Sequence, residues 1–270
     1  ADITLSLADG SGTFGGTLTV SAVAGIATFS ATQGANIDLV GAKTIAAWKS
    51  DESGGDGVGI LSQNSTAFTI DHAAASQLVF DTQPANNTVA GIALTPVIEI
   101  RDPFGNVITS GDDATADLTL SLAAGNGTLG GTLTKTASGG SVSFTATEGA
   151  NIDLVGAKTI AAWKSDESGG SGVGAFSKNS GAFTITPAVA SQLVFSTQPT
   201  DNTVAGDDLT PVVQIQDPFG NLITTTDDAT ADITLSLAAG NGTLGGTLTV
   251  TASGGVATFS TTQGVNIDLV

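Results

Sequence analysis

The side chains in this sequence that could do chemistry are mainly carboxylates. The chain has 25 aspartates and glutamates, seven lysines and arginines, one histidine, and no cysteine or tyrosine. Carboxylate oxygens bind hard cations such as Ca²⁺, and carboxylate pairs can cleave glycosides. Cysteine-based metal sites and disulfides are excluded.

The single histidine, His72, has Pro187 as its counterpart in the repeat described below. One unrepeated histidine cannot give each copy a nucleophile–base pair or an imidazole metal site. Two tryptophans in the whole chain are too few for an aromatic-lined sugar cleft. The sequence therefore predicts a protein that is not an enzyme, with His72 an ordinary solvated linker residue.

The formal charge of −18 limits the partners of this chain. Such a surface repels nucleic acid and anionic lipid and attracts cations. No apolar run is long enough to span a bilayer, so we expect no direct membrane insertion in this segment. The sequence contains no methionine, even at position 1, so we expect a processed product or a piece of a longer protein.

Internal repetition is the strongest signal in the sequence. The segment that begins at Ala1 returns at Ala116 and Ala231, an offset of 115 residues each time, and no gap is needed. Residues 116–155 and 231–270 are identical at 31 of 40 positions. A period of 115 is too long for a solenoid turn and is typical of an independently folding domain.

Each copy shows short runs of alternating apolar and polar residues between Gly, Asp, Asn and Pro. Period-two alternation rich in Thr and Val predicts strands with one buried face. The seven strands expected in one copy cover 77–83, 92–102, 116–123, 130–137, 140–147, 157–164 and 180–186. Seven such strands predict an all-β, immunoglobulin-like sandwich. Trp48 and Trp163 are interpreted as core residues of the sixth strand.

Turn and edge signals agree with this reading. Asp102-Pro103-Phe104-Gly105 fits a type I turn and recurs at 217–220. Lys135 stands where the other copies have Val20 and Val250, which predicts that its strand lies at a sheet edge.

The linkers are expected at 71–75 and 186–190, which places one complete domain at 76–187. Residues 1–72 then form the C-terminal part of a repeat, and 191–270 form the N-terminal part of another. The two partial repeats overlap in the third, fourth and fifth strands, so they do not complete one another cleanly. Truncation of a longer array is the simpler interpretation.

The segments RDPFGNVIT (101–109) and QDPFGNLIT (216–224), followed by GTLTV and GVATFS (255–260), give a more specific signal. They resemble the bacterial immunoglobulin-like tandem repeats of invasin- and intimin-like adhesins and other giant surface proteins. The resemblance implies a cell-surface or extracellular location. This sequence departs from that pattern after 140–147, where NIDLVGAKTIAAWKSDESGG makes a longer, more acidic loop.

The acidic loops suggest chemistry at the junctions between domains. In this topology the loops after the second and sixth strands lie at the N-terminal end of the domain, and the loops after the first and fifth strands lie at its C-terminal end. In a tandem array the first pair of loops of one domain therefore faces the second pair of the preceding domain. Two groups of acids are therefore expected to converge, and bridging calcium would stiffen the array. The first comprises Asp38, Asp112, Asp113, Asp166 and Glu167, and the second Asp153, Asp227 and Asp228. The alternative is that these acids are solvated turn residues; no other cofactor is expected.

Three functions stay open at this point. The first is a structural segment of a bacterial extracellular fibre, whose partners are neighbouring repeats and other copies of itself. The second is the stalk of a large adhesin that projects a terminal binding domain. The third is a spacer or carbohydrate-binding module of a secreted hydrolase, which would require exposed aromatic platforms.

Overall fold

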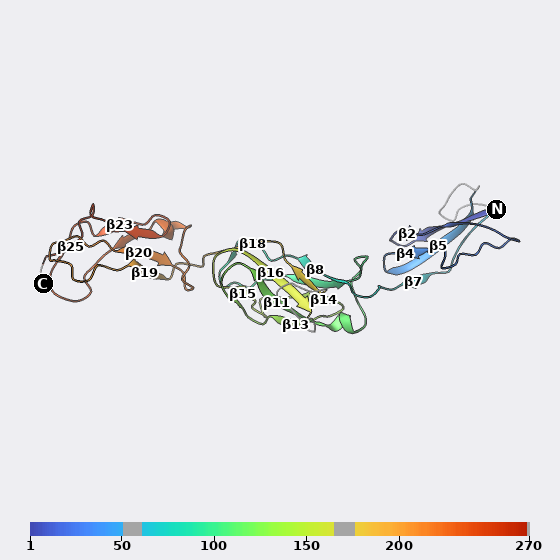
Figure 1. Ribbon diagram of the computed structural model, residues 1–270, viewed down its shortest axis with the longest axis horizontal. Coiled ribbons are helices and arrows are strands. Elements are labelled where there is room, and N and C mark those ends of the chain that lie inside the picture. The colour runs from blue at the N-terminus through green and yellow to red at the C-terminus, as the bar shows by residue number, and fades with distance from the viewer. Residues whose placement is uncertain (51–60, 165–175, 269–270) are drawn as a thin grey trace.

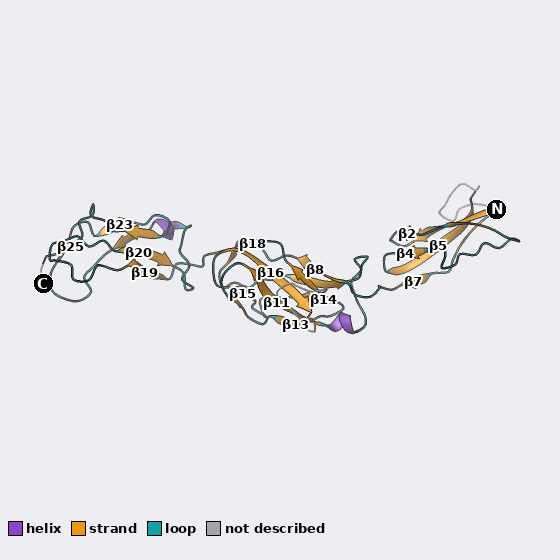
Figure 2. Cartoon of the chain, in the orientation of Figure 1, coloured by secondary structure: helices purple, strands orange, loops and turns teal. Residues whose placement is uncertain are grey.

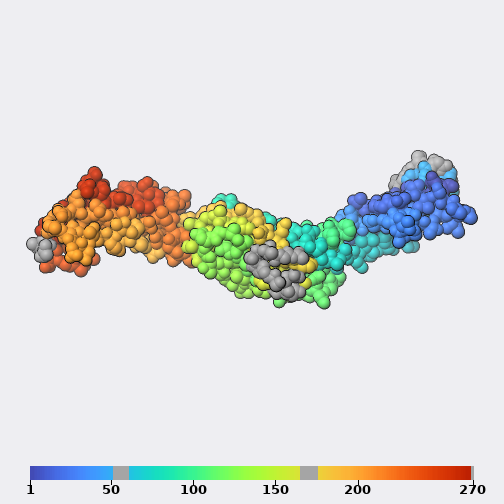
Figure 3. All heavy atoms as spheres, in the orientation of Figure 1, coloured from blue at the N-terminus to red at the C-terminus, as the bar shows by residue number. Residues whose placement is uncertain are grey.

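A computed structural model describes residues 1–50, 61–164 and 176–268. Three β-rich units follow one another along the long axis, with the two ends of the chain at opposite ends of the molecule (Figures 1 and 3). We refer to residues 1–72 as repeat 1, 76–187 as repeat 2 and 191–270 as repeat 3.

Repeat 2 is a sandwich of two sheets. The smaller sheet has the order β14-β10-β8, and all its pairs are antiparallel. Its strands are β8 (Gln77–Thr82), β10 (Val97–Arg101) and β14 (Ser141–Ser143). They correspond to the first, second and fifth strands that the sequence predicts.

The larger sheet has the order β13-β11-β16-β18-β9, and β17 also pairs with β16. Its strands are β9 (Thr88–Val89), β11 (Asp117–Ala124), β13 (Thr134–Thr136), β16 (Gly156–Lys164), β17 (Ser177–Asn179) and β18 (Phe183–Thr186). The fourth predicted strand thus pairs with the third, whereas constant-type immunoglobulin domains place it in the other sheet, together with the first, second and fifth. A short pair, β12 (Leu129–Gly130) with β15 (Asn151–Ile152), completes the repeat.

The core of repeat 2 lies between these two sheets. Leu118 and Leu120 on β11 are 0% and 1% exposed, and the alternation that predicts them is confirmed. They pack with Ile98 and Ile100 of β10 and with Phe144, which follows β14. Because this core contains no sulfur and few polar groups, apolar burial is the main source of its stability.

The two tryptophans lie on the opposite face. In the register of β11 with β16, Trp163 stands opposite Thr119, and Ala162 stands opposite the core residue Leu120. Directly opposed residues share a face, so Trp163 lies on the outer face with Thr119, where it is half-buried and its indole nitrogen is covered. Trp48 stands opposite Thr4 in the same way. The prediction that both are core residues is therefore wrong. The sequence misleads here because two alanines precede each tryptophan, and alternation between apolar and polar residues cannot be recognised.

The edge position of Lys135 is confirmed, because β13 ends the larger sheet. Its ammonium donates to the carbonyl of Ser143 at 2.8 Å and to Glu148 Oε1 at 2.7 Å. Repeat 3 has Val250 and Gln263 at the positions of Lys135 and Glu148. Repeat 3 therefore cannot form this ion pair.

Repeat 1 contains the larger sheet without the smaller one. Its strands are β1 (Asp2–Asp9), β2 (Phe14–Gly15), β3 (Thr19–Ser21), β4 (Asn36–Ile37), β5 (Gly41–Lys49), β6 (Ser62–Asn64) and β7 (Phe68–Ile70). Residues 24–30 form no strand, whereas their counterpart β14 pairs with β10. Among the described residues of repeat 1, only Lys43 and Ala46 are fully buried.

Repeat 3 contains the smaller sheet, β19-β20-β24, and part of the larger one. Its strands are β19 (Gln192–Thr197), β20 (Val212–Gln216), β21 (Asp232–Thr234), β22 (Leu244–Gly245), β23 (Thr249–Thr251), β24 (Val256–Thr258) and β25 (Asn266–Ile267). A core around Phe259, Ala257 and Val265 is buried, but Leu193 and Phe195 are 57% and 41% exposed. Their counterparts in the complete repeat, Leu78 and Phe80, are buried.

In the part of the chain that the structure describes, the helical elements are two single turns, η1 (Asp112–Thr115) and η2 (Asp227–Thr230), drawn in purple in Figure 2. Within the described ranges, no helix is long and apolar enough to cross a membrane.

Candidate functional site: the junctions between repeats

The DPFGN turn after β10 is organised by one buried carboxylate. Asp102 is 0% exposed, and its Oδ1 accepts hydrogen bonds from the amides of Phe104 and Asn106, both at 2.9 Å. Gly105 N donates to Asp102 O at 3.1 Å, which confirms the predicted turn. The other carboxylate oxygen, Oδ2, accepts from the amide of Ala73 in the linker at 3.0 Å. The linker is therefore bonded to the repeat that follows it.

Asn106, in the same turn, reaches back to repeat 1. Its Oδ1 accepts from the amide of Val40 at 3.2 Å, and its Nδ2 donates to the carbonyl of Asp38 at 2.8 Å. Nδ2 also donates to Asp102 Oδ2 at 2.9 Å. All the hydrogen-bonding groups of this amide are thus engaged. We call the turn and its backbone partners in the preceding repeat the junction clasp.

The second junction repeats the clasp 115 residues later. Asn221 Oδ1 accepts from Val155 N at 3.0 Å, and Asn221 Nδ2 donates to Asp153 O at 2.7 Å. Asp217 Oδ2 accepts from the linker amide of Ala188 at 2.9 Å. The predicted meeting of the loop after the second strand with the fifth-to-sixth loop of the preceding repeat is confirmed at both junctions.

The preceding repeat fixes its side of the clasp with a buried lysine. Lys158 is 1% exposed, and its Nζ donates to the carbonyl of Val155 at 2.9 Å. Lys43 does the same for Val40, also at 2.9 Å. Each valine is therefore held through its carbonyl by its own repeat and through its amide by the next. Burial lowers the pKa of Lys158, and the nearby charge of Asp153 opposes this effect.

An aromatic contact adds to the second junction. Phe219 of repeat 3 lies on Gly91 of repeat 2, and a Cβ at Gly91 would stand 2.5 Å from Phe219 Cζ. Gly91 also has φ +78°, which disfavours any other residue. Phe104, the counterpart of Phe219 at the first junction, is 57% exposed against 42% for Phe219.

The buried aspartates of the clasps have shifted acidities. Burial alone would raise the pKa of Asp102, but hydrogen bonds from the Asn106 side chain and from backbone amides outweigh it. The pKa therefore lies below its ordinary value of 3.8. The same balance, with Asn221, lowers the pKa of Asp217.

The acids predicted to bind calcium have separate partners in the structure. Asp38 Oδ1 accepts from Thr13 N at 2.6 Å and Asp153 Oδ1 from Thr128 N at 2.7 Å, so both carboxylates are bonded within their own repeats. Asp113 pairs with Lys164 at 2.9 Å. Asp112 lies in η1, and Asp227 and Asp228 lie in η2. Among the residues described, no three His, Asp or Glu side chains gather as a metal site would require.

Two of the predicted calcium ligands, Asp166 and Glu167, lie outside the described residues. Calcium at the junctions therefore stays a prediction.

His72, which the sequence assigns to the linker, contacts Ser110 Oγ through Nε2 at 2.9 Å and the carbonyl of Ala73 through Nδ1 at 2.9 Å. It adds a further bond between the linker and repeat 2.

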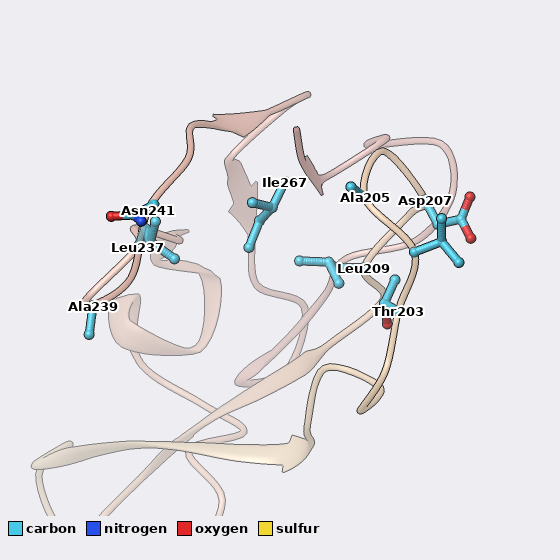
Figure 4. A pocket seen from close by; sticks show the side chains of 9 residues that line it. Thr203, Ala205, Asp207, Leu209, Leu237, Ala239, Asn241 and Ile267 are labelled. Atoms are coloured by element: carbon cyan, nitrogen blue, oxygen red, sulfur yellow. The ribbon is translucent and has the colours of Figure 1, made fainter. Parts of the chain in front are cut away.

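One pocket of repeat 3 lies on the open side of its sandwich (Figure 4). It measures about 280 Å³, and Leu209, Leu237 and Ile267 supply its apolar lining. In repeat 2 the counterparts of Leu209 and Ile267 are the core residues Leu94 and Ile152. The strands β16 and β18 of repeat 2 have no counterparts among the described residues 191–268. We therefore assign no chemistry to this pocket.

No protein-family model and no curated protein matches the sequence. Among solved structures, the Escherichia coli adhesin FdeC is similar with a TM-score of 0.37 at 14% identity, over 85% of this chain and 66% of that chain. Domains 4–9 of the surface layer protein SbsC give a TM-score of 0.28 at 12% identity, over 86% of this chain and 31% of that one. This chain spans less than two thirds of either.

Proposed function

We propose that this chain is a non-catalytic structural segment of a bacterial extracellular fibre or surface protein, in which β-sandwich repeats are held end to end in a fixed orientation. The clasp formed by Asn106 and again by Asn221 supports this proposal. The same two backbone groups are bonded at both junctions, with donor–acceptor distances that differ by at most 0.2 Å.

A fixed orientation follows from the number of restraints at each junction. A linker held only by its two peptide ends would leave the repeats free to rotate. Here the turn binds the linker through Asp102 and the preceding repeat through Asn106. Both side chains are at least nine-tenths buried, so water competes poorly for these hydrogen bonds.

Electron microscopy of the native, full-length protein tests the proposal. We expect straight rods with a regular repeat along their length. Ordered filaments of many chains would make the protein a self-assembling fibre, and single rods that end in a distinct head would make this segment an adhesin stalk. Repeats that appear as freely jointed beads would contradict the proposal.

A further inference from the structure

The first and last parts of repeat 2 are joined to each other. β9 runs parallel to β18, with Thr88 opposite Ile185 and Val89 opposite Thr186. Ala90 N donates to the carbonyl of Thr186 at 2.8 Å. β9 follows β8, the first strand of the smaller sheet, so the N-terminal segment of the repeat is bonded to both sheets.

Two side-chain amides extend this contact beyond the strand pair. Gln83 Oε1 accepts from the amide of Gly181 at 2.8 Å, and Asn86 Oδ1 accepts from the amide of Thr184 at 2.9 Å. Residues 83–87 lie outside the β ladder, with Pro84 and the positive φ of Asn87 (59°) shaping the turn. Gln83 and Asn86 thus provide acceptors where the main chain provides none. We call residues 83–90 with 181–186 the end-to-end latch.

The direction of the strands determines how the latch responds to tension. The chain enters repeat 2 before β8 and leaves it after β18, and β9 and β18 are parallel. A pull on the two ends therefore slides the two segments past each other, which loads the hydrogen bonds of the latch together rather than one after another. Forced unfolding depends on the barrier to this first rupture.

We propose that repeat 2 is a force-bearing unit, with the end-to-end latch as its mechanical lock, and that the hydrogen bonds accepted by Gln83 and Asn86 carry part of the force. This inference concerns the strength of one repeat and rests on different contacts from the junction clasps. It can hold or fail whether or not the junctions are rigid.

Single-molecule pulling across repeat 2 tests the latch in the full 270-residue chain. The chain has no cysteine, so Ala74→Cys and Val189→Cys, both at exposed positions, define the pulling points. Unfolding of the repeat is recognised by a length gain on the order of 400 Å, from about 3.6 Å per residue. The variants are Gln83→Ala with Asn86→Ala, Asn86→Asp alone, and Thr134→Ala as a control. Thr134 bonds Thr119 at 2.7 Å in the same sheet but away from the latch.

The double alanine variant is expected to unfold about tenfold faster than the parent at constant force, because two hydrogen bonds are lost from the lock. Asn86→Asp keeps an acceptor, as Asp201 does at this position in repeat 3, and is expected to unfold at close to the parent rate. Thr134→Ala should change the melting temperature without changing the unfolding rate under force. Equal rates for the parent and the double variant, or an equal acceleration in the Thr134 control, would overturn the proposal.

Discussion

Asn221 Nδ2 in repeat 3 donates a hydrogen bond of 2.7 Å to the carbonyl oxygen of Asp153 in repeat 2. The corresponding pair at the other junction, Asn106 with Asp38, is 2.8 Å. The aspartates that the sequence marks as calcium ligands thus meet the next repeat through their backbone. At each junction a neutral side-chain amide donates to a main-chain carbonyl of the preceding repeat.

The buried aspartates of the clasps should make the junctions sensitive to acid. Their pKa values lie below 3.8, so the folded state favours the charged carboxylate. This stabilisation is fully present above the ordinary pKa and is lost as the pH falls through the lower, folded value. Chemical shifts of the Ala73 and Ala188 amides, followed by NMR during an acid titration, should change below pH 3.8. A midpoint at or above 3.8 would contradict the assignment.

Lys135→Val should change the acidity of a single carboxyl group. The Lys135 ammonium and the Thr145 hydroxyl and amide lower the pKa of Glu148 from 4.5 to about 2. With valine, as in repeats 1 and 3, the pKa should move towards 4.5, measured by NMR of the Glu148 carboxyl. Because the folded pKa is depressed, the pair stabilises the fold above pH 4.5 and loses this effect as the pH falls towards 2. An unchanged pKa would show that Lys135 is not the cause.

Gly91→Ala should disturb the second junction, whereas Gly206→Ala should not. Both glycines have positive φ, 78° and 88°, so both substitutions incur the same backbone strain, about 1 kcal/mol. Only at Gly91 would the new Cβ meet Phe219; at Gly206 nothing lies within 4 Å. Calorimetry of both variants separates strain from the clash. Equal losses of stability would show that Phe219 does not pack on Gly91.

Calcium at the junctions can be tested separately from the clasp. The prediction from the acidic loops is that calcium raises the melting temperature of the chain and that a chelator lowers it. Differential scanning calorimetry with calcium, with magnesium and with chelator measures this. A melting temperature that is the same in all three would contradict the calcium prediction and leave the clasp unaffected.

Alternation along single strands was enough to predict the sandwich. Leu118 and Leu120 alternate with polar residues, and the structure buries both leucines. Alternation does not assign a face to Trp163, because residues 160–163, Ile-Ala-Ala-Trp, form an unbroken apolar run with no contrast between its two faces. Only pairing with β11 assigns the face, and that register is a long-range property.

The sequence predicts the turn of the junction clasp but not its contact with the preceding repeat. Asp-Pro-Phe-Gly predicts a turn, but Asn106 reads as one more turn residue, because local chemistry does not reveal a partner in another domain. The available signal was the asparagine at the same place in both turns, 106 and 221. The reasoning from the acidic loops placed Asp38 and Asp153 at the junctions through their carboxylates, whereas the contacts that the structure shows to the next repeat are made by their backbone carbonyls.

The most direct test of the account is the distance distribution across the second junction. Two spin labels, one on repeat 2 and one on repeat 3, can be placed in this cysteine-free chain and measured by pulsed electron spin resonance. The parent chain and the control Asn179→Ala, an exposed asparagine outside the junction, should each give one narrow distribution, and Asn221→Ala a broad one. A parent distribution already as broad as that of Asn221→Ala would contradict a fixed orientation held by the clasp.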